Sequence, residues 1–152
     1  GVELLFITLH VGLGTFQDVK VKDVRAHKME MEYYEVSLQT SEAFNRAVEG
    51  GRRIFAVGTT TMRTLESAAD GSGRLPASQG WADIFIYPGY EFKTNLAGLL
   101  TNLHIPRSTL LMLVSAFGGY EKLMSAYREA VAERYRFYSF GDCMLIFAGG
   151  GF

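Results

Sequence analysis

Residues 100–109 bring several chemically different side chains close together. They include the amide of Asn102, the imidazole of His104, the guanidinium of Arg107 and the hydroxyl of Ser108. Loops that combine so many polar groups are often binding or catalytic sites, and this one runs into a predicted helix N-terminus. A solvent-exposed loop in which Ser108 caps the helix accounts for the same residues, so both interpretations stay open at this point.

A second polar stretch, residues 57–63, lies where a predicted strand meets a predicted helix. Thr59 and Thr60 place hydroxyl and backbone N–H groups at the helix start, where the helix dipole favours a carboxylate or phosphate. The alternative is ordinary helix capping by one threonine, with Arg63 paired to Glu66 three positions later.

A glycine-containing turn follows the first predicted strand. His10, Gly12, Gly14 and Thr15 partly match a dinucleotide-binding pattern, but Gln17 stands where the third glycine belongs. No helical pattern follows the turn, so the sequence does not favour a nicotinamide site. The glycines also fit a plain tight turn, and His10 fits either a structural hydrogen-bonded histidine or a base.

Two further stretches hold titratable or aromatic residues. Residues 27–32 contain Glu32 without the spacing of a metal-ligand motif, so we expect no metal. Residues 135–142 interleave aromatic rings with Arg136 and Asp142. This arrangement can stack a nucleobase or a sulfonium, although core packing also explains the aromatic residues.

Strands and helices are predicted to alternate along most of the chain. This alternation predicts an α/β fold with a mixed, partly parallel sheet flanked by helices, in one domain over residues 1–152. Strands are expected over 2–11, 17–28 in part, 33–38, 53–57 and 82–87, with a hairpin of 137–140 and 144–147. Helices are expected from a Ser41 cap to residue 48, over 62–69, over 108–117 and, after a glycine break, over 120–135.

The composition is that of a folded globular protein, with 48% hydrophobic and 20% charged residues and a net charge of -1. No overall cationic excess points to DNA or to an anionic membrane, and no apolar run reaches the roughly 20 residues of a spanning helix. The single cysteine, Cys143, forms no internal disulfide and is expected to be a small core residue. A reducing, cytoplasmic location is expected.

Six stretches, taken in order, closely resemble one family, the S-adenosylmethionine:tRNA ribosyltransferase-isomerases of queuosine biosynthesis. The resemblance runs nearly from end to end of the chain. The stretches are residues 8–16, 27–33, 56–66, 85–90, 100–109 and 135–142.

The resemblance implies an enzyme that transfers and isomerises the ribosyl part of S-adenosylmethionine onto a 7-aminomethyl-7-deazaguanine base in a tRNA anticodon. Epoxyqueuosine, adenine and methionine are the implied products. S-adenosylmethionine is then a cosubstrate, the partner is tRNA, and no metal is implied. The chemistry needs a base, an acid and a pocket for a flipped-out nucleobase.

The same resemblance suggests a role for each matched polar residue. The acid–base candidates are His10, Glu32, His104 and Asp142. The candidates for binding S-adenosylmethionine are Gly12, Gly14, Thr15, Thr59, Thr60, Arg63 and Asn102. Arg107 and Arg136 are the candidates for contacting tRNA phosphates.

The chain departs from the family pattern at four positions and in its length. Asp18 stands where the family usually has Pro, Leu103 where it has Phe, and Arg107 where it often has Lys. Glu30 stands where the family commonly has His, and a carboxylate there acts as a base more readily than as a cationic acid. The chain also resembles only the C-terminal part of the catalytic α/β domain, a larger barrel-like fold, without the N-terminal part or the inserted small β-barrel.

Two other functions stay open from the sequence. A folded but inactive module would bind nucleotide or RNA only, and it can pair with a second copy to cover an unpaired sheet edge, whereas the full-length family is monomeric. An ordinary methyltransferase would release S-adenosylhomocysteine instead of adenine.

Overall fold

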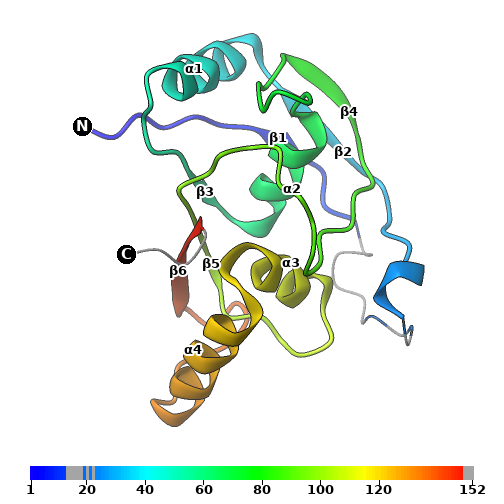
Figure 1. Ribbon diagram of the computed structural model, residues 1–152, viewed down its shortest axis with the longest axis vertical. Helices are drawn as coiled ribbons and strands as arrows, with labels where there is room; N and C mark the ends of the chain where they lie inside the picture. Colours follow the sequence, from blue (N-terminus) through cyan, green and yellow to red (C-terminus); the bar gives the residue numbers. More distant parts are fainter. Residues whose placement is uncertain (13–18, 20, 22, 149–152) are drawn as a thin grey trace.

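The computed structural model describes residues 1–12, 19, 21 and 23–148 of the chain (Figure 1). The strands of this part are β1 (Thr8–Leu9), β2 (Glu32–Val36), β3 (Phe55–Val57), β4 (Ser78–Ala82), β5 (Gly98–Asn102) and β6 (Cys143–Phe147). Its helices are α1 (Leu38–Glu49), α2 (Thr59–Ala68), α3 (Thr109–Gly118), α4 (Tyr120–Ala132) and a short 3-10 helix (Val24–Ala26). None of these helices is long and apolar enough to cross a bilayer.

The strands pair in two separate sheets. The first has the order β1-β2-β4 and is antiparallel throughout, and the second has the order β3-β5-β6. In the second sheet β3 runs parallel to β5 while β6 runs antiparallel to it. The predicted α/β class with partly parallel pairing is therefore confirmed, although the strands form two sheets instead of one.

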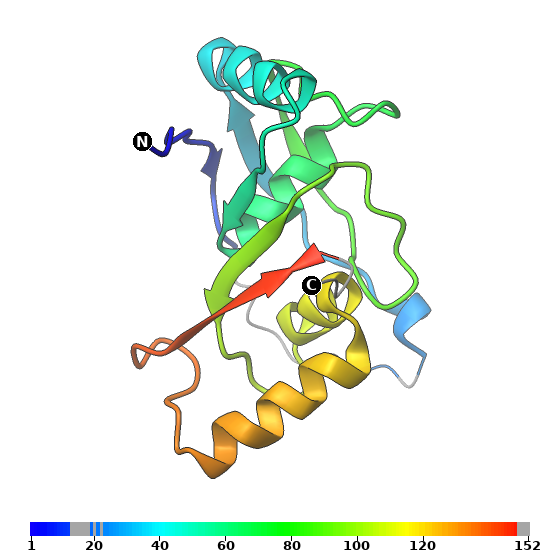
Figure 2. The same cartoon turned by 60° about the vertical axis from the view of Figure 1, so that its left-hand side comes forward.

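Helix α2 connects the two sheets. It contacts β1 and β4 of the first sheet and β3 and β5 of the second (Figures 1 and 2). Met62, Leu65 and Ala68 recur three residues apart along it and are all buried, which is the apolar stripe of a core-facing helix. The N-terminal end of α2 is thereby fixed beside the carboxyl ends of β3 and β5.

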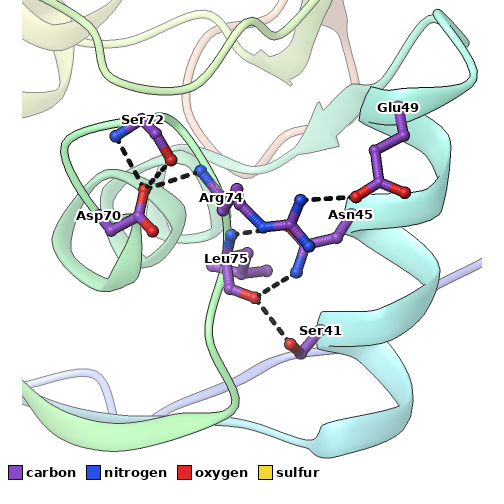
Figure 3. A network of polar contacts seen from close by, with 7 residues as sticks. All are labelled: Ser41, Asn45, Glu49, Asp70, Ser72, Arg74 and Leu75. Carbon is purple, nitrogen blue, oxygen red and sulfur yellow. Dashed lines mark hydrogen bonds and ion pairs between the residues drawn. The ribbon is translucent and has the colours of Figure 1, made fainter.

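Helix α1 is attached to the turn before β4 by side-chain contacts with backbone groups (Figure 3). Asn45 accepts from the Leu75 N–H and donates to the Leu75 carbonyl, both at 2.9 Å, and the Ser41 hydroxyl donates to the same carbonyl at 2.7 Å. Arg74 forms an exposed ion pair with Glu49. The contacts with Leu75 provide hydrogen-bond partners for the N–H and carbonyl of this fully buried residue, and they thereby fix the position of α1.

Helices α3 and α4 lie at the end of the molecule away from α1 (Figure 2). Ser108 caps α3 by accepting from the Leu111 N–H at 3.1 Å, as predicted. Gly119 has φ 84°, a conformation that favours glycine, and it separates the two helices. The predicted break between these helices is confirmed.

The sequence predicts a buried strand over 2–11, and this prediction is wrong for most of its length. Only Thr8–Leu9 pairs with β2, while Val2 and Phe6 are 89% and 76% exposed. The physical reason lies in the partner strand. Because β2 ends at Val36 and α1 begins directly afterwards, residues 2–6 have no strand of the first sheet beside them.

The strand predicted over 82–87 is displaced toward the N-terminus. Strand β4 covers Ser78–Ala82, in a stretch whose glycine and polar residues suggest a linker. A Cβ atom at Gly80 would lie 3.2 Å from the Tyr34 hydroxyl of the neighbouring strand. Glycine is therefore placed there to make room for a packed tyrosine, which sequence alone does not reveal.

The predicted hairpin of 137–140 and 144–147 is also wrong. Residues 137–140 form no strand, and β6 pairs instead with β5, which the sequence analysis assigned in part to a loop. Residue Cys143 is exposed and not in the core. Long-range pairing of this kind depends on the tertiary arrangement, which a local pattern does not encode.

Three smaller corrections concern helices. The cap of α1 is Ser37, which accepts from the Thr40 N–H, whereas Ser41 lies inside the helix and Val48 is 38% exposed. Helix α2 begins earlier than predicted, at Thr59. The partial strand predicted in 17–28 is wrong for the residues that are described there, 19, 21 and 23–28, because none of them is in a strand and Val24–Ala26 form the 3-10 helix.

Candidate functional site

A cavity of about 440 Å³ opens at the carboxyl ends of the parallel strands β3 and β5. This is the edge at which open α/β sheets usually bind ligands, and the volume lies in the range of small-molecule sites. Four predicted site residues line it, namely Thr59, Thr60, Asn102 and His104. The wall also includes Val11, Gly58, Leu100, Tyr138, Ser139 and Cys143.

The N-terminus of α2 forms one wall of this cavity. Its cap residue is Gly58, with φ 92°, and no side chain caps the helix there. The first N–H groups of an α-helix have no partner within the helix and carry the positive end of its dipole. With Thr59 and Thr60 lining the cavity, this wall is suited to an anionic group such as a carboxylate.

His104 forms a buried polar part of the cavity wall. Its Nε2 atom lies 3.0 Å from the Thr101 hydroxyl, and its backbone N–H donates to the Tyr127 hydroxyl at 2.8 Å. Burial lowers the pKa of His104 to about 4. The imidazole is therefore neutral near pH 7, while Asn102, two residues earlier, presents an exposed amide at the end of β5.

Tyr138 is a cavity residue in the aromatic stretch that the sequence analysis considered for stacking a nucleobase or a sulfonium, but it was not selected as a site residue. It has φ 65°, which is uncommon for a bulky residue, and its N–H donates to the Leu103 carbonyl at 2.8 Å. A strained conformation that also lines a cavity is a functional signal, but it is visible only in the backbone geometry.

Glu32 and Arg63 form a buried ion pair beside the cavity. Arg63 Nη2 lies 2.8 Å from Glu32 Oε2 and donates to the Ala82 carbonyl at 3.0 Å. Burial lowers the pKa of Arg63 although the Glu32 carboxylate opposes the shift. Thr59 and Thr60 line both the cavity and a small gap next to Arg63, so the pair adjoins the cavity wall.

The alternative partner that the sequence offered for Arg63 is wrong. The Glu66 carboxylate instead accepts from the backbone N–H groups of Lys93 and Thr94, at 2.8 and 3.0 Å, and from the Thr94 hydroxyl. It is fully buried and holds the segment before β5 against α2. Their three-residue spacing on the helix does not determine the pairing, because Arg63 and Glu66 each bind partners that are distant in the sequence.

Gly12, the first residue of the predicted glycine turn, contacts the same ion pair. The Gly12 N–H donates to Glu32 Oε1 at 2.8 Å. A Cβ atom at this position would lie 3.8 Å from Glu32 Oε1 and 3.9 Å from Glu30 Oε2, so both carboxylates lie against the glycine. Two further predicted binding residues, Gly14 and Thr15, lie outside the described residues.

The other predicted site residues lie outside the cavity wall. His10 is exposed and its ring lies 5.7 Å from the ring of Tyr33. Asp142 accepts from the Arg136 N–H at 2.6 Å and from Arg136 Nε at 3.2 Å. The Arg136 guanidinium holds the pKa of Asp142 below its usual value, and Arg107 is exposed with φ 60°.

The described residues contain no group of three or more His, Cys, Asp or Glu side chains that could hold a metal ion. The polar groups of the cavity are hydroxyls, an amide, a neutral imidazole and helix N–H groups. This set fits an organic ligand with an anionic end. The fold and the cavity thus define an α/β protein with a cavity of small-molecule size at the carboxyl ends of parallel strands, which is the candidate site.

Comparison with known proteins agrees with the resemblance. A family described as queuosine biosynthesis protein matches residues 1–146, so the chain belongs to that family. The chain is 56% identical over 146 residues to a Clostridioides difficile protein named S-adenosylmethionine:tRNA ribosyltransferase-isomerase, and 58% identical over 146 residues to a Symbiobacterium thermophilum protein of the same name. Each match covers 96% of this chain and 42% of the relative, so the chain spans less than half the length of these curated relatives.

A solved structure is similar as well. It is the crystal structure of the Thermotoga maritima S-adenosylmethionine tRNA ribosyltransferase, with a TM-score of 0.66 and 53% sequence identity. The match covers 76% of this chain and 40% of that one.

Proposed function

We propose that this chain provides the S-adenosylmethionine site of a tRNA ribosyltransferase-isomerase in queuosine biosynthesis. The reaction transfers and isomerises the ribosyl moiety to a 7-aminomethyl-7-deazaguanine base of the tRNA anticodon, giving epoxyqueuosine, adenine and methionine. One observation carries the proposal. Three family-like stretches that are far apart in the sequence, around Thr59, Asn102 and Tyr138, line one cavity.

The α2 wall binds the amino-acid end of S-adenosylmethionine in this proposal. The carboxylate lies against the first N–H groups of α2, near Thr59 and Thr60, where the dipole favours negative charge. The Asn102 amide can both donate to and accept from the ribose hydroxyls. These contacts bind a substrate that ends in a carboxylate and carries a ribose.

The part of the wall that contains Tyr138 and His104 faces the sulfonium and the adenine in this proposal. The Tyr138 ring offers an aromatic face to the cation or the base. A neutral His104 does not repel the sulfonium, and with its low pKa it acts as a weak base or a hydrogen-bonding group, not as a cationic acid. The carboxylates of Glu30 and Glu32, which lie against Gly12, are the other candidate proton acceptors.

Glu32 and Arg63 position the start of the glycine segment through the Gly12 N–H. Glu32 stays an acid–base candidate in this proposal, with Glu30 beside it. His10 and Asp142 keep the same candidate role only if the longer protein brings them to the substrate, because neither lines the cavity. Arg107 and Arg136 remain the proposed tRNA-phosphate contacts, and both are exposed.

The chain corresponds in this proposal to the C-terminal part of a larger catalytic domain that is monomeric and cytoplasmic. An apolar cavity of about 570 Å³ lies between the N-terminal segment and β3. Val2, Leu4 and Phe6 are exposed there, although burying such side chains is favourable. The additional residues of the longer relatives are the proposed cover.

The test is adenine release from S-adenosylmethionine and tRNA bearing the 7-aminomethyl-7-deazaguanine base. The chain alone is compared with the chain joined to the upstream part of the Clostridioides difficile relative. Equal amounts of adenine and methionine from the joined protein are expected, with Asn102→Ala lowering the rate about tenfold or more. Asn95→Ala, an exposed asparagine before β5, is the matched control.

Each other outcome has a separate meaning. Release of S-adenosylhomocysteine identifies a methyltransferase, and no product from either protein contradicts the proposed function. Product from the joined protein alone shows that the isolated chain carries an incomplete site.

A further inference from the structure

The solvent face of the first sheet carries a row of three rings, one from each strand region. His10 follows β1, Tyr33 lies on β2 and Trp81 lies on β4. The His10 and Tyr33 rings are 5.7 Å apart, and the Tyr33 and Trp81 rings are 5.5 Å apart with an edge-to-face angle of 68°. Backbone pairing fixes this row, because Tyr33 is the register partner of Trp81 and its carbonyl accepts from the His10 N–H.

The two outer rings of the row, His10 and Trp81, are exposed, the central Tyr33 ring is half-buried, and the row is held in place. Trp81 is 61% exposed, which is unusual for the largest apolar side chain in a protein. The Tyr33 hydroxyl donates to Gln79 Oε1 at 3.0 Å, so the central ring is fixed from its polar end. An ordered aromatic surface of this kind offers ring area to a ligand at little entropic cost.

The adjacent row of side chains on the same sheet face indicates which chemical groups of a ligand this face can bind. It consists of Thr8, Glu35 and Gln79, which are register partners across the three strands. The Glu35 carboxylate repels phosphate but accepts hydrogen bonds from N–H donors. The face therefore suits a flat nucleobase with N–H groups better than a sugar–phosphate backbone.

The row of three rings adjoins the cavity along the main chain. His10 ends the row, and the next residue, Val11, lines the cavity. A strand of RNA that delivers one base into the cavity would thus bring its neighbouring bases toward this sheet face. Exposed aromatic rings on a sheet are the usual means by which proteins stack unpaired bases.

We propose that His10, Tyr33 and Trp81 form a stacking surface for an unpaired base of the RNA substrate, next to the base that enters the cavity. The inference rests on the proposed function for its partner, a tRNA. It gives His10 a binding role on the sheet face. Trp81 lies outside the six stretches that carry the family resemblance, so the sequence analysis did not select it.

Trp81 is the single tryptophan of the chain, so its fluorescence reports directly on stacking. The chain is titrated with a seven-nucleotide single-stranded RNA and with the same oligonucleotide lacking its central bases. Quenching by the complete RNA and much weaker quenching by the abasic one are expected. Equal quenching by both, or none by either, overturns the proposal.

Substitutions provide the second measurement, with fluorescence anisotropy of labelled RNA as the readout. Trp81→Ala is expected to weaken binding about tenfold, whereas Trp81→Phe retains most of it. Tyr120→Ala is the matched control, because Tyr120 is 56% exposed on α4. An affinity unchanged by Trp81→Ala, or lowered equally by Tyr120→Ala, overturns the proposal.

The two proposals fail in different ways. In the protein joined to the upstream part of the relative, Trp81→Ala is expected to raise KM for tRNA with kcat unchanged. Adenine release with normal KM in this variant overturns the stacking surface alone. Base-dependent quenching without any adenine release overturns the proposed function alone.

Discussion

His104 is a buried imidazole whose protonation is linked to stability. Its pKa is about 4 in the folded chain and about 6.5 when unfolded, so the unfolded chain binds the proton first as the pH falls. This contribution to stability is complete above pH 6.5 and is lost between pH 6.5 and 4, on the order of 3 kcal/mol. Urea unfolding at a series of pH values measures it, with His104→Gln as control. A variant that keeps the same pH dependence contradicts this assignment.

The Glu32–Arg63 pair is the most deeply buried ion pair of the described residues, with side chains 1% and 5% exposed. Glu32→Leu leaves the buried Arg63 charge without this partner and is expected to cost about 3–5 kcal/mol in the free energy of unfolding. Adding Arg63→Met is expected to recover much of that loss.

Urea denaturation measures both effects. Arg52→Met is the matched control, because it removes the exposed Arg52–Glu3 pair and should cost less than about 1 kcal/mol. Comparable losses at the buried and exposed pairs would contradict the role given to burial.

Helix α1 depends on its contact with Leu75. Asn45→Ala removes both hydrogen bonds to this buried residue and leaves the Leu75 N–H without its partner. The expected loss is about 1–3 kcal/mol, because a buried backbone donor without a partner is costly. Chemical denaturation measures it, and Gln39→Ala, at an exposed position of α1, should have little effect. Equal midpoints for Asn45→Ala and the unsubstituted chain would show that the contact does not hold α1.

The two ends of α3 were accessible from sequence, whereas the starts of α1 and α2 were not. Ser108 and the Gly118–Gly119 pair marked the limits of α3 because a hydroxyl cap and a positive-φ glycine act locally. Strands were less accessible. Strand β5 is defined by partners from distant parts of the chain, β3 and β6, and its five residues carry no local signal of either.

The candidate site also combines residues that the sequence reveals by their type with contacts that only the tertiary structure reveals. The threonines at the start of α2 and the loop after β5 were found by residue type, and the fold brings them to one cavity. The Tyr138 backbone conformation and the Glu32–Arg63 pair were not predictable, because one is a dihedral angle and the other a contact between distant elements.

The whole molecule exposes an apolar surface at its N-terminal segment. Val2, Leu4 and Phe6 lie along the cavity beside β3, and burying them against a second copy is favourable. The isolated chain is therefore expected to self-associate, with a mass by light scattering of twice its 16.9 kDa. Joining it to the upstream part of a relative should restore a monomer, and Leu4→Ser with Phe6→Ser should weaken association. A monomeric isolated chain would contradict this expectation.

The central claim is that the cavity at the ends of β3 and β5 binds S-adenosylmethionine. Isothermal titration calorimetry of the chain with S-adenosylmethionine tests it most directly. The account predicts saturable binding that weakens about tenfold in Tyr138→Ala, because the proposed site places this ring against the sulfonium or the adenine. Binding is expected to be unchanged in Tyr135→Ala, an exposed tyrosine outside the cavity wall. Absence of binding, or equal weakening by both substitutions, would contradict it.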